Sequence, residues 1–215
     1  MTRMDSVATR NRWLLGSRSY TFLVGARFLV TVAVQMQAVS IGWLTYDLSR
    51  DPLALGLVGL AEAAPALGLA LFAGLIVDRG NPLTIYRRAL ACSIASALLL
   101  WAASARAEAG AGAAALGVIY AASMLTGAAR AFIMPSNFAL LSRVVRREQM
   151  GTATVWSSSV MQTAFLAGPP LGGALLALAG APRTFLVVVA LLVFFFINMT
   201  GVVEVGAVVV DDPNA

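Results

Sequence analysis

Long apolar runs separated by short polar stretches make up most of this chain. Each of six runs holds enough residues, at about 1.5 Å of rise per helical residue, to cross a bilayer. A polar leader (1–19) precedes the runs and a polar tail (205–215) follows them. The pattern predicts an all-α polytopic membrane protein whose bundle occupies 20–204. Its expected transmembrane helices span about 20–46, 53–77, 83–105, 113–141, 150–179 and 184–203.

The fifth expected helix contains two adjacent prolines between glycines, Gly168-Pro169-Pro170-Leu171-Gly172-Gly173, and a turn at Ala181-Pro182-Arg183 follows it. Adjacent prolines would break a helix in water, whereas in a bilayer neighbouring helices can satisfy the freed backbone groups. The glycines let another helix approach closely. A kinked helix with a flat glycine face suits a pivot or seal in a moving bundle. Static packing of small residues explains the same spacing.

Composition supports a membrane protein. Apolar residues make up 60% of the 215 and charged residues 12%, against about 25% charged in a soluble domain. All fifteen basic residues are arginines, and most of them gather at the ends of the apolar runs, which favours membrane topology over nucleic-acid binding. One cysteine and no histidine exclude a disulfide framework and argue against a metal site. The chain has no phosphate-binding loop and no nucleophile with an evident base, so we expect no catalytic residue and no cofactor.

The arginines also predict an orientation. Ten lie in the leader and in the loops after the second and fourth expected helices, whereas three (Arg50, Arg106 and Arg183) lie on the other side. Positive charge accumulates on the cytoplasmic side of membrane proteins. We therefore expect a cytoplasmic amino terminus and, after six crossings, a cytoplasmic carboxyl terminus.

The first and second halves of the chain resemble each other. Gly25-Ala26-Arg27-Phe28 is similar to Ala128-Ala129-Arg130-Ala131-Phe132, and the apolar stretch beginning at Pro65 is similar to the one at Pro169-Pro170. Arg27 precedes Pro65 by 38 residues, and Arg130 precedes Pro169 by 39. This predicts two three-helix repeats. Because each has an odd number of crossings, the two would be inverted in the membrane, as in many secondary transporters.

Several stretches carry a family resemblance: 43–48 and 51–60 around the first turn, 74–79 before the second, 135–141 and 144–150 around the end of the fourth helix, and 168–173 in the fifth. In them the chain resembles the amino-terminal half of a major facilitator superfamily transporter, of the drug and siderophore exporter branch related to the enterobactin exporter. The resemblance extends over roughly residues 20–205.

The resemblance implies a bacterial inner-membrane transporter that exports small amphipathic compounds by proton coupling. It implies a gating loop at Gly74, Asp78 and Arg79, with the charged pair locking the cytoplasmic helix ends. Gly168, Pro169, Pro170, Gly172 and Gly173 would form the helix-five motif of exporters. The lipid bilayer, a small-molecule substrate and a second six-helix half are the implied partners, the last as a separate chain, a missing portion or a second copy; nucleic acid is not.

The chain departs from the family pattern in two places. Gly80-Asn81-Pro82 replaces the expected glycine and basic pair of the loop, and Arg87-Arg88 arrive late. The family has twelve helices, whereas six are expected here. This leaves the basic partners of Asp78 and Arg79 open, and it requires a second half for a complete transport pathway.

Charged groups inside hydrocarbon cost about 2.5–3.5 kcal/mol each on insertion scales. Glu62 lies within the second expected helix, where it is either a proton-coupling carboxylate or the partner of Arg27 or Arg130. Arg27 can also extend to water at the helix end, and Arg130 is the stronger candidate for a cavity. The amides are either cavity-lining or helix-linking groups; they are Gln35, Gln37, Asn137 and Gln162.

These observations favour a secondary transporter. The alternative is a non-transporting membrane subunit, or a truncated pseudo-transporter, that only packs against partner helices. Neutralising Glu62 distinguishes the two, because a coupling residue would lose transport with folding retained.

Overall fold

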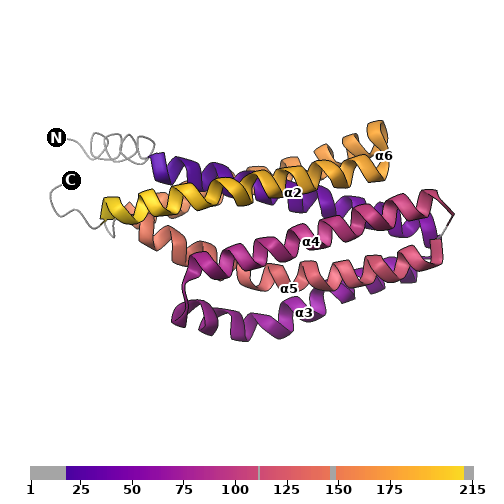
Figure 1. Ribbon diagram of the computed structural model, residues 1–215, viewed down its shortest axis with the longest axis horizontal. Helices are drawn as coiled ribbons and strands as arrows, with labels where there is room; N and C mark the ends of the chain where they lie inside the picture. The colour runs from indigo at the N-terminus through magenta and orange to yellow at the C-terminus, as the bar shows by residue number, and fades with distance from the viewer. Residues whose placement is uncertain (1–17, 111, 146–148, 211–215) are drawn as a thin grey trace.

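The structure is a computed structural model that describes residues 18–110, 112–145 and 149–210. All regular elements in these ranges are helices, and they lie side by side along one axis (Figure 1). Each is long and apolar enough to cross a membrane. The expected leader up to residue 17 and the last five residues of the expected tail lie outside the described residues. The elements are α2 (Arg18–Ser49), α3 (Pro52–Arg79), α4 (Pro82–Glu108), α5 (Gly112–Val144) and α6 (Met150–Val210).

Two connections are built from the same local signals. Asp51 and Asn81 are the N-caps of α3 and α4, and their side chains accept hydrogen bonds from the second following backbone N–H, at 2.9 and 3.1 Å. A proline follows each cap at the first helical position, where its missing N–H costs nothing. Arg50, the residue after α2, has a positive φ of 52° and donates through its side chain to Asp47. These caps let the chain reverse direction between consecutive helices within a few residues.

The element α6 contains a break at Gly180, where the backbone angles are φ 80° and ψ 170°. Glycine adopts this conformation without a steric penalty, and Pro182 is tolerated in the first turn of the following arm. The two arms run in opposite directions (Figure 1). The chain therefore reverses at Gly180, and the expected turn residues 181–183 are already helical. The second arm continues to Val210, beyond the expected start of the tail.

Helix α2 packs mainly on α6, whereas α3 packs mainly on α5. Glycines bring both pairs into close contact. A Cβ atom at Gly172 would lie 2.8 Å from the Cα atom of Met36, and one at Gly168 would collide with Gln35. At the α3–α5 contact, a Cβ atom at Gly127 would collide with the main chain of Glu62. The backbone stays helical through Pro169 and Pro170, so two glycines of this motif act as close-packing residues in this conformation.

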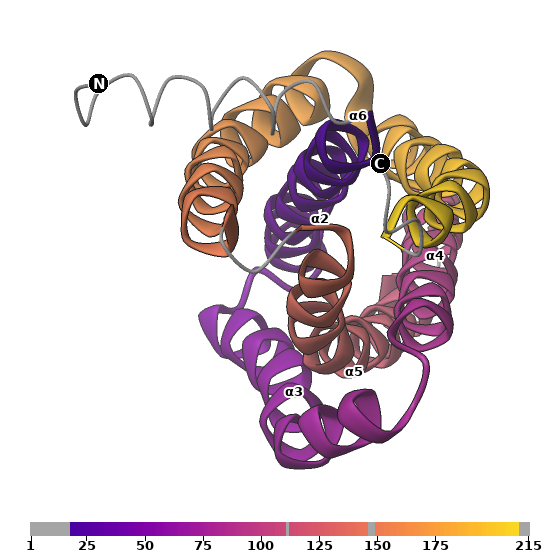
Figure 2. The same ribbon diagram turned by 90° about the vertical axis from the view of Figure 1, so that its left-hand side faces the viewer.

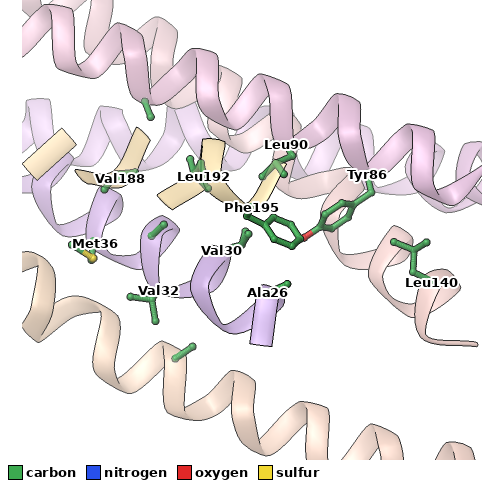
Figure 3. Close-up of a cluster of buried hydrophobic side chains, with 13 residues drawn as sticks. Ala26, Val30, Val32, Met36, Tyr86, Leu90, Leu140, Val188, Leu192 and Phe195 are labelled. Carbon is green, nitrogen blue, oxygen red and sulfur yellow. The ribbon is translucent and has the colours of Figure 1, made fainter. Parts of the chain in front are cut away.

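Three clusters of buried apolar residues form the core. The largest joins α2, α4, α5 and α6, and contains the edge-to-face pair Tyr86 and Phe195, whose ring centroids are 6.1 Å apart (Figure 3). A second joins Ile41, Leu100 and Phe185 at the other end. Helix α3 contributes little to either cluster. It lies at the edge of the bundle in the end-on view (Figure 2), with only 11% of its most apolar window buried.

A polar network crosses the bundle between α2, α4 and α5. The Gln37 amide donates to the hydroxyls of Thr126 (3.1 Å) and Ser96 (3.4 Å), which are themselves 2.7 Å apart. All three residues are buried. Of the two roles open to Gln37, the structure therefore assigns it helix–helix hydrogen bonding.

We predict that Gly172→Ala destabilises the protein by about 1–3 kcal/mol, because the added methyl group is forced against the Met36 backbone. Gly173→Ala is the matched control, since no atom lies within 4 Å of a Cβ there. Thermal unfolding of the detergent-solubilised protein measures both. Equal melting temperatures for the two variants would contradict the α2–α6 packing.

Candidate functional site

An ion pair links α3 and α5 in the middle of the bundle. Glu62 Oε1 contacts Arg130 Nη1, and the side chains are 19% and 39% exposed on this chain. Gly127, one helical turn before Arg130, allows this approach because the main chain of Glu62 lies directly against it. Of the two arginines considered as partners of Glu62, the structure selects Arg130.

Arg27 has different surroundings. It is 7% exposed, and its guanidinium reaches across to α6, where it donates to Ser157 Oγ at 2.7 Å and to Met161 Sδ at 3.5 Å. Its Nε atom is buried without a hydrogen-bond partner. Within the described ranges, no carboxylate forms an ion pair with it. Because Arg27 lies nine residues beyond Arg18 and points sideways to α6, the structure does not support the interpretation that it extends to water at the helix end.

A pocket of about 180 Å³ lies beside Arg27. It brings together two of the expected cavity residues, Arg27 and Gln162. Its lining combines hydroxyls from the first turns of α6 with methionine and phenylalanine side chains from α5 and α6. The lining residues are Arg27, Met134, Phe138, Leu141, Thr154, Ser157, Ser158, Met161, Gln162 and Phe165.

The other amide candidates lie elsewhere. Gln35 is half-buried, with its Cβ atom at the contact made by Gly168. Asn137 is buried beside the Tyr86 hydroxyl, and its Oδ1 atom makes no hydrogen bond. Neither residue lines the Arg27 pocket, so the four polar candidates do not form one site.

The expected gating residues lie at the end of α3. Asp78 and Arg79 are exposed, and no ion pair joins either to another described residue. Gly74 is half-buried with open space around it. Arg87 lies over the Phe196 ring, 5.5 Å from its centroid, and so does not reach the α3 end. The charge lock stays a prediction.

Sequence reasoning missed most residues of the pocket. On α6 they recur at helical spacing at positions 154, 157, 158, 161, 162 and 165, and on α5 at 134, 138 and 141. The signal was present in the run Ser157-Ser158-Ser159, since consecutive hydroxyls are unusual in an apolar helix. The described residues hold no group of three metal-ligating side chains, and Cys92 is a free thiol.

A family model described as the Major Facilitator Superfamily matches residues 23–211 of this chain. No curated protein sequence matches it significantly. The family match covers both arms of α6 and every pocket residue.

We predict that Glu62→Gln and Arg130→Gln each lower the free energy of unfolding by about 1–3 kcal/mol. Each substitution leaves one charge unpaired inside the bundle, and partial exposure of Arg130 keeps the loss below that of a fully buried pair. The double variant should recover part of the loss. The exposed pair Asp47–Arg50 is the control, where neutralisation should cost about 0–1 kcal/mol. Additive losses in the Glu62–Arg130 cycle would show that the pair contributes no coupling.

Proposed function

This chain belongs to the Major Facilitator Superfamily, and on that basis we propose that it forms one six-helix half of an exporter that moves small amphipathic compounds by proton coupling. The family is one of secondary transporters and not of enzymes. The chain is accordingly an integral membrane protein with transport as its activity class. The six crossings, the direction, the coupling ion and the exporter branch are parts of the proposal.

The break in α6 supports six crossings. The candidate span 150–198 holds 49 residues, about 70 Å of helix, whereas a bilayer core is about 30 Å thick. Reversal at Gly180 turns this length into two crossings. A bundle of six helices with cytoplasmic termini in the inner membrane then agrees with the distribution of arginines.

The packing pattern supports inverted repeats. The first helix packs against Gly168 and Gly172 in the first arm of α6, the fifth helix of six. The fourth helix, α5, packs on α3, the second. This pairing arises when the middle helix of each repeat packs against the first helix of the other repeat. The matched arginines do not sit at equal heights, however: Arg27 lies nine residues beyond Arg18, and Arg130 eighteen beyond Gly112. The proposal therefore rests on the helix pairing and not on the Arg27–Arg130 match.

The pocket beside Arg27 is the observation that carries the export of amphipathic compounds. A site lined by hydroxyls and an amide together with methionine and phenylalanine side chains suits a molecule with a polar part and an apolar part. All residues that line the pocket lie within the candidate spans.

The Glu62–Arg130 pair offers a physical basis for proton coupling. A proton delivered to the carboxylate removes its charge and so weakens the link between α3 and α5. Because that link joins helices from the two proposed repeats, proton binding and release would shift one repeat relative to the other.

A second half has a surface to bind. Helix α3 leaves large apolar side chains uncovered by the rest of this chain, with Leu71 86% exposed and Leu67 73% exposed. Lipid covers part of such a surface in any membrane protein. We propose that another six-helix bundle covers the rest, and that Asp78 and Arg79 at the end of α3 form the charge lock beside it. The same uncovered helix favours the alternative of a non-transporting subunit.

We predict opposite labelling at the end of α3 and the end of α4. In a Cys92→Ala background, a membrane-impermeant maleimide added to spheroplasts should label Glu108→Cys and spare Asp78→Cys. Both positions are exposed, so permeabilised membranes should label equally. Labelling of Asp78→Cys in sealed spheroplasts would reverse the proposed orientation.

We also predict proton-driven transport by the native gene product in everted membrane vesicles, assayed with cationic, neutral and anionic amphipathic dyes. A protonophore should abolish dye accumulation. The variant Glu62→Gln/Arg130→Gln should insert normally and lose most of the proton-driven component. Folded wild-type protein that moves no dye would favour the non-transporting subunit, and unchanged transport by the double variant would remove Glu62 from coupling.

A further inference from the structure

We propose that the pocket beside Arg27 binds the anionic group, a carboxylate or phosphate, of an amphiphile whose apolar part is an aromatic ring or a short alkyl segment. This inference rests on the proposed export of amphipathic compounds and names the class of compound. It concerns binding, so it can be tested without transport.

The charge of Arg27 is the first argument. Arg27 and Arg130 are both arginines within the candidate spans, but Arg130 has a carboxylate partner and Arg27 has none among the described residues. At 7% exposure Arg27 is also the more deeply buried of the two. A buried cation without a counter-charge is costly, and an anion entering the pocket would supply the missing charge.

The unused hydrogen-bonding capacity of Arg27 is the second argument. A guanidinium carries five N–H donors. The described contacts of Arg27 are one hydroxyl, Ser157 Oγ, and one thioether sulfur, Met161 Sδ, which is a weak acceptor. The Nε–H donor is buried with no partner. Ser157 accepts from Arg27 and keeps its own hydroxyl proton, which can be donated to the same anion.

The apolar wall and the size of the pocket define the rest of the ligand. Met134 and Phe138 from α5 and Phe165 from α6 line the pocket together with the hydroxyls. A dry apolar cavity of roughly 150 Å³ holds a benzene molecule. A pocket of about 180 Å³ therefore has room for one ring or a short alkyl segment together with a small anionic group.

The experiment compares three ligands of one shape: 4-phenylbutyrate, its neutral amide 4-phenylbutanamide, and the cation 4-phenylbutylamine. Binding to the full chain is measured by titration calorimetry in nanodiscs of phosphatidylcholine. We expect phenylbutyrate to bind about 10- to 100-fold more tightly than the amide, the range set by charge-assisted hydrogen bonds, and the amine to bind weakest.

Variants assign the effect to Arg27. Arg27→Gln should remove the preference for the anion, and Arg27→Lys should retain part of it because the charge remains. Arg50→Gln, which removes an exposed arginine just beyond the far end of α2, should bind like wild type. If Arg27→Gln fails to fold, Ser157→Ala provides the second test and should weaken phenylbutyrate binding while leaving amide binding unchanged. Equal affinity of wild type for the anion and the amide would overturn the proposal.

A lipid head group and a soluble compound are both possible sources of the anion. Nanodiscs that contain phosphatidylglycerol distinguish them. Competition that weakens phenylbutyrate binding to wild type identifies the anion as a lipid phosphate, and undiminished binding identifies a soluble amphiphile; both results support an anion site.

The two proposals can fail separately. Anion-selective binding without dye transport would leave this site standing and remove the exporter. Transport of cationic or neutral dyes by both wild type and Arg27→Gln, with no anion preference in the calorimeter, would leave the exporter standing and remove this site.

Discussion

The structure depends on one constraint: inside hydrocarbon, a polar group must find its partner within the protein. The bundle meets this constraint in two places. Gln37, Ser96 and Thr126 share hydrogen bonds between three helices. Glu62 and Arg130 neutralise each other between α3 and α5. Arg27 is the exception, because a hydroxyl and a sulfur are the partners given to a full positive charge. Such local shortfalls are where membrane proteins hold their ligands.

Much of the architecture follows from hydropathy. Apart from a closed barrel, only helices can hydrogen-bond all their backbone N–H and C=O groups across a bilayer. Helices α3 and α4 begin at Pro52 and Pro82, one residue before the expected starts at about 53 and 83, because Asp51 and Asn81 cap them and each proline takes the first helical position. The reversal before the last arm was placed one residue late, at 181–183. Gly180 carries the positive φ instead, and Pro182 already belongs to the next helical turn.

The site was harder to predict, because helix-to-helix distances are absent from a one-dimensional pattern. Glu62 had two plausible arginine partners, and only the depth at which α5 meets α3 decides between them. Gln35 and Asn137 were grouped with Gln162 by residue type, yet rotation about each helix axis sends them to different surfaces. Gly168 and Gly172 share one face by their four-residue spacing, whereas Gly173 points away, which the motif alone does not reveal.

The break at Gly180 also bears on how the protein is made. A single non-helical residue joins the two arms of α6, so the arms stay next to each other as the chain leaves the ribosome. The arms can enter the bilayer as one helical hairpin, because α6 contains the most apolar window among the described helices. Arg183 is the one charged residue near the reversal at Gly180, so little charge has to cross the bilayer when the hairpin inserts. A glycine at this position thus serves biogenesis as well as the finished fold.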